Sequence, residues 1–266
     1  MSGIIKLSSA STREYWEINI LFEDEHLLAL NKPPRLLSVP EQSQPEKPSL
    51  LKLLHADITR GAAWARQREI TYLSNVHRLD FETTGVFLLA RNKLAQLALA
   101  NQFGSEKPSL TDVALVRGVP AKKEFAIDAK LAPYPVNPDL IRVDSRKGKR
   151  ARTEFSVREL FAGYALMECR PLTNRTHQVR VHLKHAKLPI VGDSVYGAPP
   201  LLLSKLKTDY HLKPGAVERP LISHTALHAE QLTFSHPVSE APITILAPWP
   251  KDFTVAVKYL RRYAIG

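Results

Sequence analysis

The chain has 266 residues, of which 44% are hydrophobic and 24% are charged. This length allows a sizeable core, arranged as one large domain or two small ones. Lysine and arginine number 37 against 26 acidic residues, a formal net charge of +11 that favours a polyanionic partner, either nucleic acid or an acidic membrane face. A merely basic soluble protein has the same composition. The lone cysteine, Cys169, excludes an internal disulfide and a cysteine-based zinc site, and no stretch approaches a membrane span, so we expect a cytoplasmic protein.

The first half of the chain predicts a hairpin, two helices and a buried strand. After an N-terminal extension of residues 1–18, apolar stretches on either side of a polar turn predict a hairpin over 19–31. A basic helix is expected over 57–67. The unbroken apolar run 86–90 is typical of a strand buried on both faces. Leucines and alanines at helical spacing then predict a helix over 94–104.

The second half, which meets the first near residues 105–122, is richer in strands. Predicted strands cover 122–127, 153–160, 164–169 and 243–246, with loops at 133–138 and 198–221 and a last helix at 253–263. The strands at 153–160 and 164–169 alternate in polarity and predict an antiparallel pair. The mixture indicates an α+β fold, with a mixed, mostly antiparallel sheet flanked by helices. No glycine-rich dinucleotide or P-loop motif is present.

Asp80 is the first candidate for chemistry. It lies in the polar loop His77-Arg78-Leu79-Asp80, followed by Phe81-Glu82-Thr83-Thr84-Gly85, immediately before the buried strand. A carboxylate in the loop that leads into a rigid buried strand can act as a nucleophile or a base. The alternative is an aspartate that only caps the turn.

A second segment, 170–197, strengthens the catalytic interpretation. Thr176 can cap a short helix on which Val179, Leu183 and Ala186 share an apolar face, although the β-branched residues leave a strand possible. Arg180 points away from that face. An arginine on a helix or strand that packs against the core can pair with a buried carboxylate and keep it ionised.

These segments carry a family resemblance. The motifs are HRLDFETTG at 77–85, TNRTHQVRVHL at 173–183 and PIVGDSVYG at 189–197, together with ILFEDEHLLALNKPPRLLSVP at 20–40 and the closing LHA at 227–229. Several long motifs in this order resemble the RluA-type pseudouridine synthases, from about residue 19 to the C-terminal strand. The family's additional S4-type RNA-binding module has no counterpart, so the chain resembles a bare catalytic domain with an RNA-binding cleft across its sheet.

The resemblance implies that uridine within ribosomal or transfer RNA is isomerised to pseudouridine without a cofactor. Asp80 matches the catalytic aspartate, acting either on ribose C1′ or as a base on the ribose, and Arg180 matches the arginine that pairs with it. The uridine must leave its stack to reach such a pocket. Arg78 is a candidate to fill the vacated place by stacking, or else makes a surface phosphate contact.

The chain departs from the family pattern at two positions. Phe125 stands where the family has tyrosine, so a stacking platform for uracil remains but the hydroxyl is lost; plain core packing is the alternative. Asn174 replaces a glycine, and asparagine tolerates left-handed backbone angles.

RNA is the expected partner, with no membrane and no protein partner implied. The basic run 146–152 is expected to be a phosphate track, with an ordinary solvated loop as the alternative. The candidate RNA-binding residues are His77, Arg78, Thr84, Lys123, Arg146, Lys147, Lys149, Arg150, Arg152, Arg175 and His177.

Histidines are frequent enough to raise the question of a metal, and His224 and His228 have helical i, i+4 spacing. No zinc-enzyme signature accompanies them, so no metal is expected. Two other functions remain as alternatives: a non-catalytic RNA-binding or assembly protein on the same scaffold, favoured only by Phe125, and a glycoside hydrolase using Asp80 with Glu82.

Overall fold

The computed structural model describes residues 3–213 and 215–265, and the chain divides into two units. Unit 1 contains residues 1–110 and 229–248, and unit 2 contains residues 111–228 and 249–266. Each unit is therefore built from two separate pieces of the chain. One of the boundaries between the units lies between Leu110 and Thr111.

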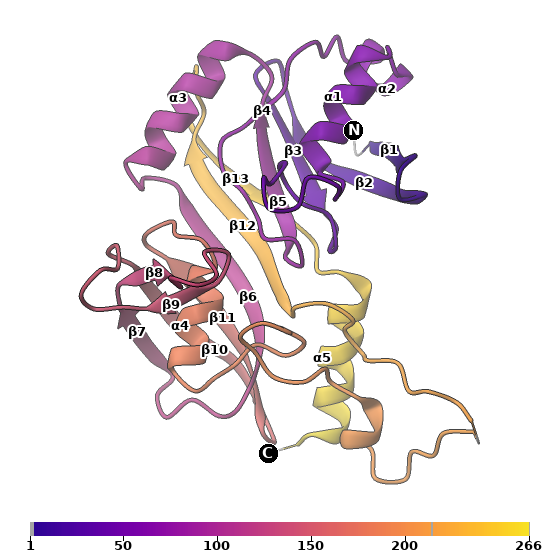
Figure 1. The fold of residues 1–266 in the computed structure, drawn as a ribbon, viewed down its shortest axis with the longest axis vertical. Coiled ribbons are helices and arrows are strands. Elements are labelled where there is room, and N and C mark those ends of the chain that lie inside the picture. The colour runs from indigo at the N-terminus through magenta and orange to yellow at the C-terminus, as the bar shows by residue number, and fades with distance from the viewer. Residues whose placement is uncertain (1–2, 214, 266) are drawn as a thin grey trace. The chain divides into compact units, whose positions relative to one another are not determined.

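Unit 1 is built on antiparallel strands (Figure 1). In sheet order these are β1 (Ile4–Ser9), β2 (Glu14–Glu23), β3 (Leu27–Lys32), β5 (Thr84–Ala90) and β12 (Leu227–Ser235), with β4 (Ser74–Asn75) beside β5 and β13 (Pro242–Leu246) beside β12. The pairs β1–β2, β2–β3, β3–β5 and β12–β13 are antiparallel. The hairpin expected over 19–31 is confirmed. Residues 4–18, which the sequence sets apart as an extension, form β1 and part of β2, and Ile5 and Leu7 lie in the core.

Helices cover both faces of β5 because its side chains alternate. Phe87 and Leu89 pack in one cluster with α1 (Leu50–Thr59), whereas Val86 and Leu88 pack in another with α3 (Lys93–Gly104). All seven residues of β5 are buried, as the apolar run predicts. The strand is thereby fixed on both sides, which makes its first residues a rigid base for the loop that precedes it.

The helix predicted over 57–67 is wrong in its bounds. Instead α1 ends at Thr59 and a short α2 (Ala63–Gln67) follows. Gly61 lies between them with φ +66°. A left-handed residue ends an α-helix, so the basic stretch cannot continue as one helix.

Unit 2 contains a second antiparallel array. In sheet order its strands are β6 (Ser109–Arg117), β11 (Tyr164–Pro171), β10 (Arg152–Phe161) and β7 (Glu124–Asp128), with a separate pair β8 (Leu131–Pro133) and β9 (Ile141–Val143). The predicted pair 153–160 and 164–169 is the hairpin β10–β11. One core cluster takes side chains from β6, β10, β11, α4 (Gln178–His185) and α5 (Lys251–Tyr263). The described part of the expected loop, residues 198–213 and 215–221, contains no α-helix or strand and has one short 3-10 turn, η1 (Leu203–Lys205).

Candidate active site

Asp80 lies in a tight turn directly before β5. The Thr83 N–H donates to the Asp80 carbonyl at 3.1 Å and closes the turn, while the Asp80 side chain is half-buried. The turn leads into Thr84 and Gly85, the first residues of β5. Gly85 has φ +115°, and a Cβ there would lie 2.1 Å from the carbonyl oxygen of Ala229 in β12. Only glycine allows the two strands to approach so closely at the base of the Asp80 turn.

Two side chains, Lys32 at the end of β3 and Ser38 in the segment after it, hold the backbone on either side of Asp80. The Ser38 hydroxyl donates to the Leu79 carbonyl and accepts from the Leu79 N–H at 2.9 Å. The Lys32 ammonium donates to the carbonyls of Pro33 at 2.8 Å and Phe81 at 3.2 Å. Sequence reasoning placed both residues in a family motif but gave them no role. A lysine that ends an otherwise apolar strand was the available signal.

Lys32 is fully buried, with an exposed fraction of 0%. Burial lowers its pKa to about 7, although the nearby carboxylates of Asp80 and Glu82 act to raise it. Glu82 in turn lies 3.9 Å from the Arg35 guanidinium. The Asp80 turn is therefore backed by a mixed cluster of charges, of which only Lys32 is wholly removed from solvent.

His77 has a structural place that the sequence did not indicate. Its ring is buried, stacks on Phe103 at 5.3 Å between centroids, and accepts the Leu88 N–H at Nε2 over 2.9 Å. Burial lowers the pKa of His77 to about 4, so the ring is neutral at pH 7, as an acceptor at Nε2 requires. Thr84 is buried as well. These positions argue against the predicted RNA contacts of His77 and Thr84.

Arg78 differs from its neighbour. Its side chain is exposed, and Nη2 lies 3.2 Å from the Glu41 carboxylate. An exposed guanidinium beside Asp80 is compatible with the predicted stacking or phosphate contact.

The second segment folds as helix α4, as predicted, but its N-terminus is different. The N-cap is His177, with φ 55° and ψ 19°, and no side chain caps the helix, so the predicted Thr176 cap is wrong. Val179 and Leu183 are buried in the core as expected. The left-handed backbone of His177, and not a side-chain cap, changes the chain direction at the start of α4.

Arg180 is buried and paired, and its observed partner is Asp193. Arg180 Nε and Nη2 donate to the two Asp193 oxygens at 2.8 and 3.0 Å. The backbone N–H groups of Val195 and Tyr196 also donate to Asp193. Burial alone raises the pKa of Asp193, but the hydrogen bonds and charge of Arg180 and the two N–H groups outweigh it and hold the pKa below its usual range. Asp193 therefore fixes the direction of the guanidinium.

Tyr196 joins three parts of unit 2 around Arg180. Its ring lies under the guanidinium, with 4.9 Å from Cζ to the centroid. Its hydroxyl accepts the Ile141 N–H at 2.7 Å and lies 2.8 Å from His177 Nδ1. Asp193 and Tyr196 both fall in the segment PIVGDSVYG, where sequence reasoning assigned neither a role. Asp80 belongs to unit 1 and Arg180 to unit 2, and their pairing stays a prediction.

Phe125 lies half-buried on β7, stacked on Phe155 of β10 with ring centroids 5.1 Å apart. Both rings belong to the side of the sheet that packs in the unit 2 core. The Phe125 ring therefore packs against the core on one side and keeps a partly exposed face on which a base could stack.

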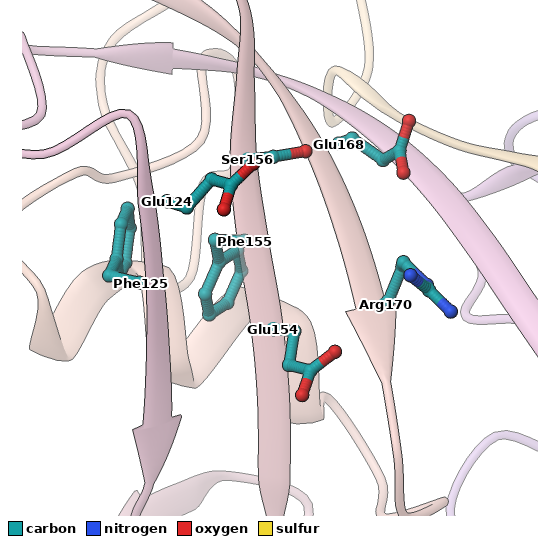
Figure 2. A pocket seen from close by; sticks show the side chains of 7 residues that line it. All are labelled: Glu124, Phe125, Glu154, Phe155, Ser156, Glu168 and Arg170. Atoms are coloured by element: carbon teal, nitrogen blue, oxygen red, sulfur yellow. The ribbon is translucent and has the colours of Figure 1, made fainter.

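A hollow of about 430 Å³ lies over the same strands (Figure 2), but its chemistry does not fit RNA. It is lined by Phe125, Phe155, Ser156 and Arg170 and by the carboxylates of Glu124, Glu154 and Glu168. Glu124, Ser156 and Glu168 are register partners and share one face of the sheet, while Phe125 and Phe155 pair on the other. Carboxylates repel phosphate, so we do not place the RNA backbone in this hollow.

The basic run is largely a solvent-exposed loop. The Asp144 carboxylate accepts the N–H groups of Arg146 and Lys147 at 3.0 and 2.9 Å, and these bonds hold the pKa of Asp144 below its usual range. Arg175 donates to the Arg150 carbonyl at 3.0 Å and so ties this loop to the segment before α4. The exposed cations are Arg146, Lys147, Lys149 and Arg150, and Lys123 is exposed as well. Arg152 differs because it lies on β10, 3.6 Å from Asp128 and 3.8 Å from Glu154.

The histidine pair near the C-terminus does not lie on a helix. His224 precedes β12 and His228 lies within it, so the helical spacing was misleading. The Nδ1–H of His224 donates to the Thr225 carbonyl at 2.9 Å, and its Nε2 lies 3.2 Å from Asp252. Within residues 3–213 and 215–265, no three histidine, cysteine or acidic side chains form a possible metal site. Over the same part of the chain, every helix is too short or too polar to cross a bilayer.

Comparison with known proteins places this geometry in a family. Residues 26–185 match the family model described as RNA pseudouridylate synthase. Ribosomal large subunit pseudouridine synthase D of Xylella fastidiosa is 37% identical over 92% of this chain and 70% of its own length. Dual-specificity RNA pseudouridine synthase RluA of Escherichia coli is 33% identical over 89% of this chain and 94% of its own length.

A solved structure supports the same fold. Human RNA Pseudouridylate Synthase Domain Containing 4 superposes with a TM-score of 0.68 and 24% identity, covering 91% of this chain and 92% of that chain. Residues 26–185, which match the family model, include the Asp80 turn, the basic run and helix α4. The chain therefore belongs to the RNA pseudouridylate synthase family, in its RluA-type branch.

Proposed function

We propose that this protein converts uridine in structured ribosomal or transfer RNA to pseudouridine, with Asp80 as the catalytic carboxylate. The observation that carries the proposal is the construction of the Asp80 turn. Its backbone is held on both sides by Ser38 and Lys32, and it leads into the fully buried strand β5. A carboxylate on such a base is presented in a fixed direction, as catalysis on a ribose requires.

The reaction breaks the bond from ribose C1′ to N1 of uracil and forms a bond from C1′ to C5. The hydrogen on C5 leaves to solvent, and N1 takes a proton, so atoms and charge balance without a cofactor. Asp80 acts either by attack on C1′ or as a base on the ribose; both roles need its ionised form.

Arg180 is proposed to act beside Asp80 as a fixed cation. Asp193 and the Tyr196 ring hold the guanidinium from two sides, so it needs no reorganisation when substrate binds. Phe125 supplies an aromatic face for uracil without a phenol group. Exposed cations of the basic run, with Arg175 and Lys123, are proposed to follow the RNA backbone; Arg78 is proposed to stack in the place of the flipped base.

The test uses RNA transcripts labelled with tritium at C5 of uridine. Wild-type protein should release tritium to water from ribosomal or transfer RNA, and Asp80→Asn should release none while RNA affinity is retained. Asp139→Asn is the matched control, because Asp139 is an exposed aspartate in a loop of unit 2 and should leave release unchanged. Equal release by Asp80→Asn and wild type would show that Asp80 is not the catalytic group.

A non-catalytic RNA-binding role is the second candidate, favoured by the missing hydroxyl at Phe125. It predicts that wild-type protein binds RNA but releases no tritium. It also predicts that Asp80→Asn complements deletion of the gene as well as wild type does.

A further inference from the structure

Arg78, which the proposed function places against RNA, is paired with a carboxylate of the protein itself. Its Nη2 donates to Oε1 of Glu41 at 3.2 Å, and the second oxygen of Glu41, Oε2, accepts Nε2 of Gln44 at 3.1 Å. Both carboxylate oxygens therefore have a donor, and Gln44 helps to set the direction in which Glu41 points. The Arg78 side chain is 48% exposed and that of Glu41 is 25% exposed, so the arginine is the partner that is more accessible to RNA.

The loop that contains this carboxylate lies along the Asp80 turn. Near its start, the Ser38 hydroxyl bonds to both the N–H and the carbonyl of Leu79. Near its end, the Lys47 ammonium lies over the Phe81 ring, 4.4 Å from the centroid. Leu79 and Phe81 are the residues on either side of Asp80. An RNA whose ribose reaches Asp80 must therefore come close to this loop.

A carboxylate in this place affects RNA binding in two ways. It repels the phosphates of an approaching RNA, and it occupies the guanidinium of Arg78. An ion pair that is partly open to solvent is weak, equivalent to about a two- to fivefold change in an equilibrium constant. Arg78 can therefore leave Glu41 at small cost when RNA offers a phosphate or the vacated position of a flipped base.

We propose that Glu41 is a positioning residue for Arg78: it holds the guanidinium on the protein before RNA binds and releases it to the RNA in the complex. This inference rests on the proposed function, which places Arg78 against RNA. The exchange breaks one contact between arginine and carboxylate and forms one contact between arginine and RNA. Glu41 therefore lowers the affinity for RNA by the strength of the pair, and it disfavours polyanions that offer Arg78 no such contact.

The experiment measures dissociation constants by filter binding of labelled ribosomal and transfer RNA transcripts. Glu41→Gln removes the charge but keeps the length of the side chain and an oxygen that can accept from Gln44. It should bind RNA about two- to fivefold more tightly than wild type, because no ion pair has to be broken. A damaged loop would weaken binding, so a merely structural role does not predict this gain.

Glu46→Gln is the matched control for the change in charge. Glu46 is exposed, lies in the same loop and forms no ion pair within residues 3–213 and 215–265. Its substitution removes one negative charge and should change the affinity by less than about 1.5-fold, since salt screens an exposed charge.

Arg78→Met tests whether Glu41 acts through the arginine. In that background, Glu41→Gln should improve binding no more than Glu46→Gln does, because the pair no longer exists. Thermal unfolding of each variant establishes that it is folded, and Glu41→Ser takes the place of Glu41→Gln if the latter does not fold.

The inference is overturned if removal of the Glu41 charge improves binding no more than Glu46→Gln, or if the gain is the same with and without Arg78. Its failure is distinct from failure of the proposed function, because binding is measured without turnover. If the proposed function fails, wild-type protein releases no tritium from any RNA, whatever the affinities of these variants.

Discussion

Replacing Gly85 by alanine tests how the base of the Asp80 turn is built. An alanine Cβ would lie 2.1 Å from the Ala229 carbonyl oxygen and 2.8 Å from the Ala229 nitrogen. These are backbone atoms of a neighbouring strand and cannot rotate away as a side chain would. The residue would also have to keep φ +115°, which L-residues rarely adopt.

Both effects contribute to the expected loss of stability. Backbone strain costs about 1–3 kcal/mol, and forcing strands apart in a packed core costs about 1–3 kcal/mol. Together they predict that the free energy of unfolding falls by about 4 kcal/mol. At roughly 2–4 °C for each kcal/mol, the unfolding temperature should fall by about 8–16 °C. Tritium release should be lost as well, because β5 carries the Asp80 turn.

Gly61→Ala is the control in the same unit. Gly61 also has positive φ, at +66°, but the nearest atom to an added Cβ is the flexible Arg66 side chain at 3.8 Å. Only strain remains, at about 1–2 kcal/mol, and the unfolding temperature should fall by only a few degrees. Thermal unfolding followed by circular dichroism measures both variants. If Gly85→Ala unfolds at the same temperature as Gly61→Ala, the close approach to β12 does not limit this position and the reasoning fails.

Three further predictions concern buried or half-buried side chains. Arg180→Met leaves the Asp193 carboxylate buried and unpaired, so urea unfolding should show a loss of about 3–5 kcal/mol, and adding Asp193→Asn should recover part of it; no recovery would mean that the pair is not the cause. The lowered pKa of His77 contributes stability that is fully present above its ordinary pKa of 6.5 and is lost as the pH falls toward about 4, a loss of about 3 kcal/mol. Urea unfolding at several pH values should show this slope, and His77→Gln, whose amide oxygen can still accept the Leu88 N–H, should flatten it; an unchanged slope would assign the effect to other groups. Phe125→Tyr should fold within about 0.5 kcal/mol of wild type, and a rise in tritium release above about tenfold would contradict the proposal that this protein works without a phenol group.

Local patterns in the sequence predicted local structure well. The hairpin β2–β3 follows from a polar turn between apolar stretches, and the hairpin β10–β11 follows from two alternating stretches on either side of Ala162 and Gly163. The buried strand β5 and helices α3 and α5 follow from hydrophobic spacing. In each case the side chains that face the core are neighbours in the sequence, so their period is visible there.

Sequence patterns failed where a contact joins distant residues. Nothing near Arg180 indicates that Asp193 would take its guanidinium, because the pairing depends on how the chain after α4 turns back. The same holds for Lys32 and Phe81, which are 49 residues apart. His77 was predicted to contact RNA, but an available N–H on Leu88 and the Phe103 ring make burial favourable. Secondary-structure propensities do not predict which distant residue a side chain will contact.

The division of each unit into two chain pieces has a consequence for synthesis on the ribosome. One core cluster of unit 1 combines Leu27 and Val86 with Leu232, Phe234 and Ile245, which are made only after most of unit 2. A nascent chain that stops at residue 228 contains all the strands up to β11 but lacks the residues of β12 and β13 that complete this cluster. Folding of the unit that carries Asp80 must therefore wait until residues 229–248 have been made, and products that stop before them should expose apolar surface to chaperones and proteases.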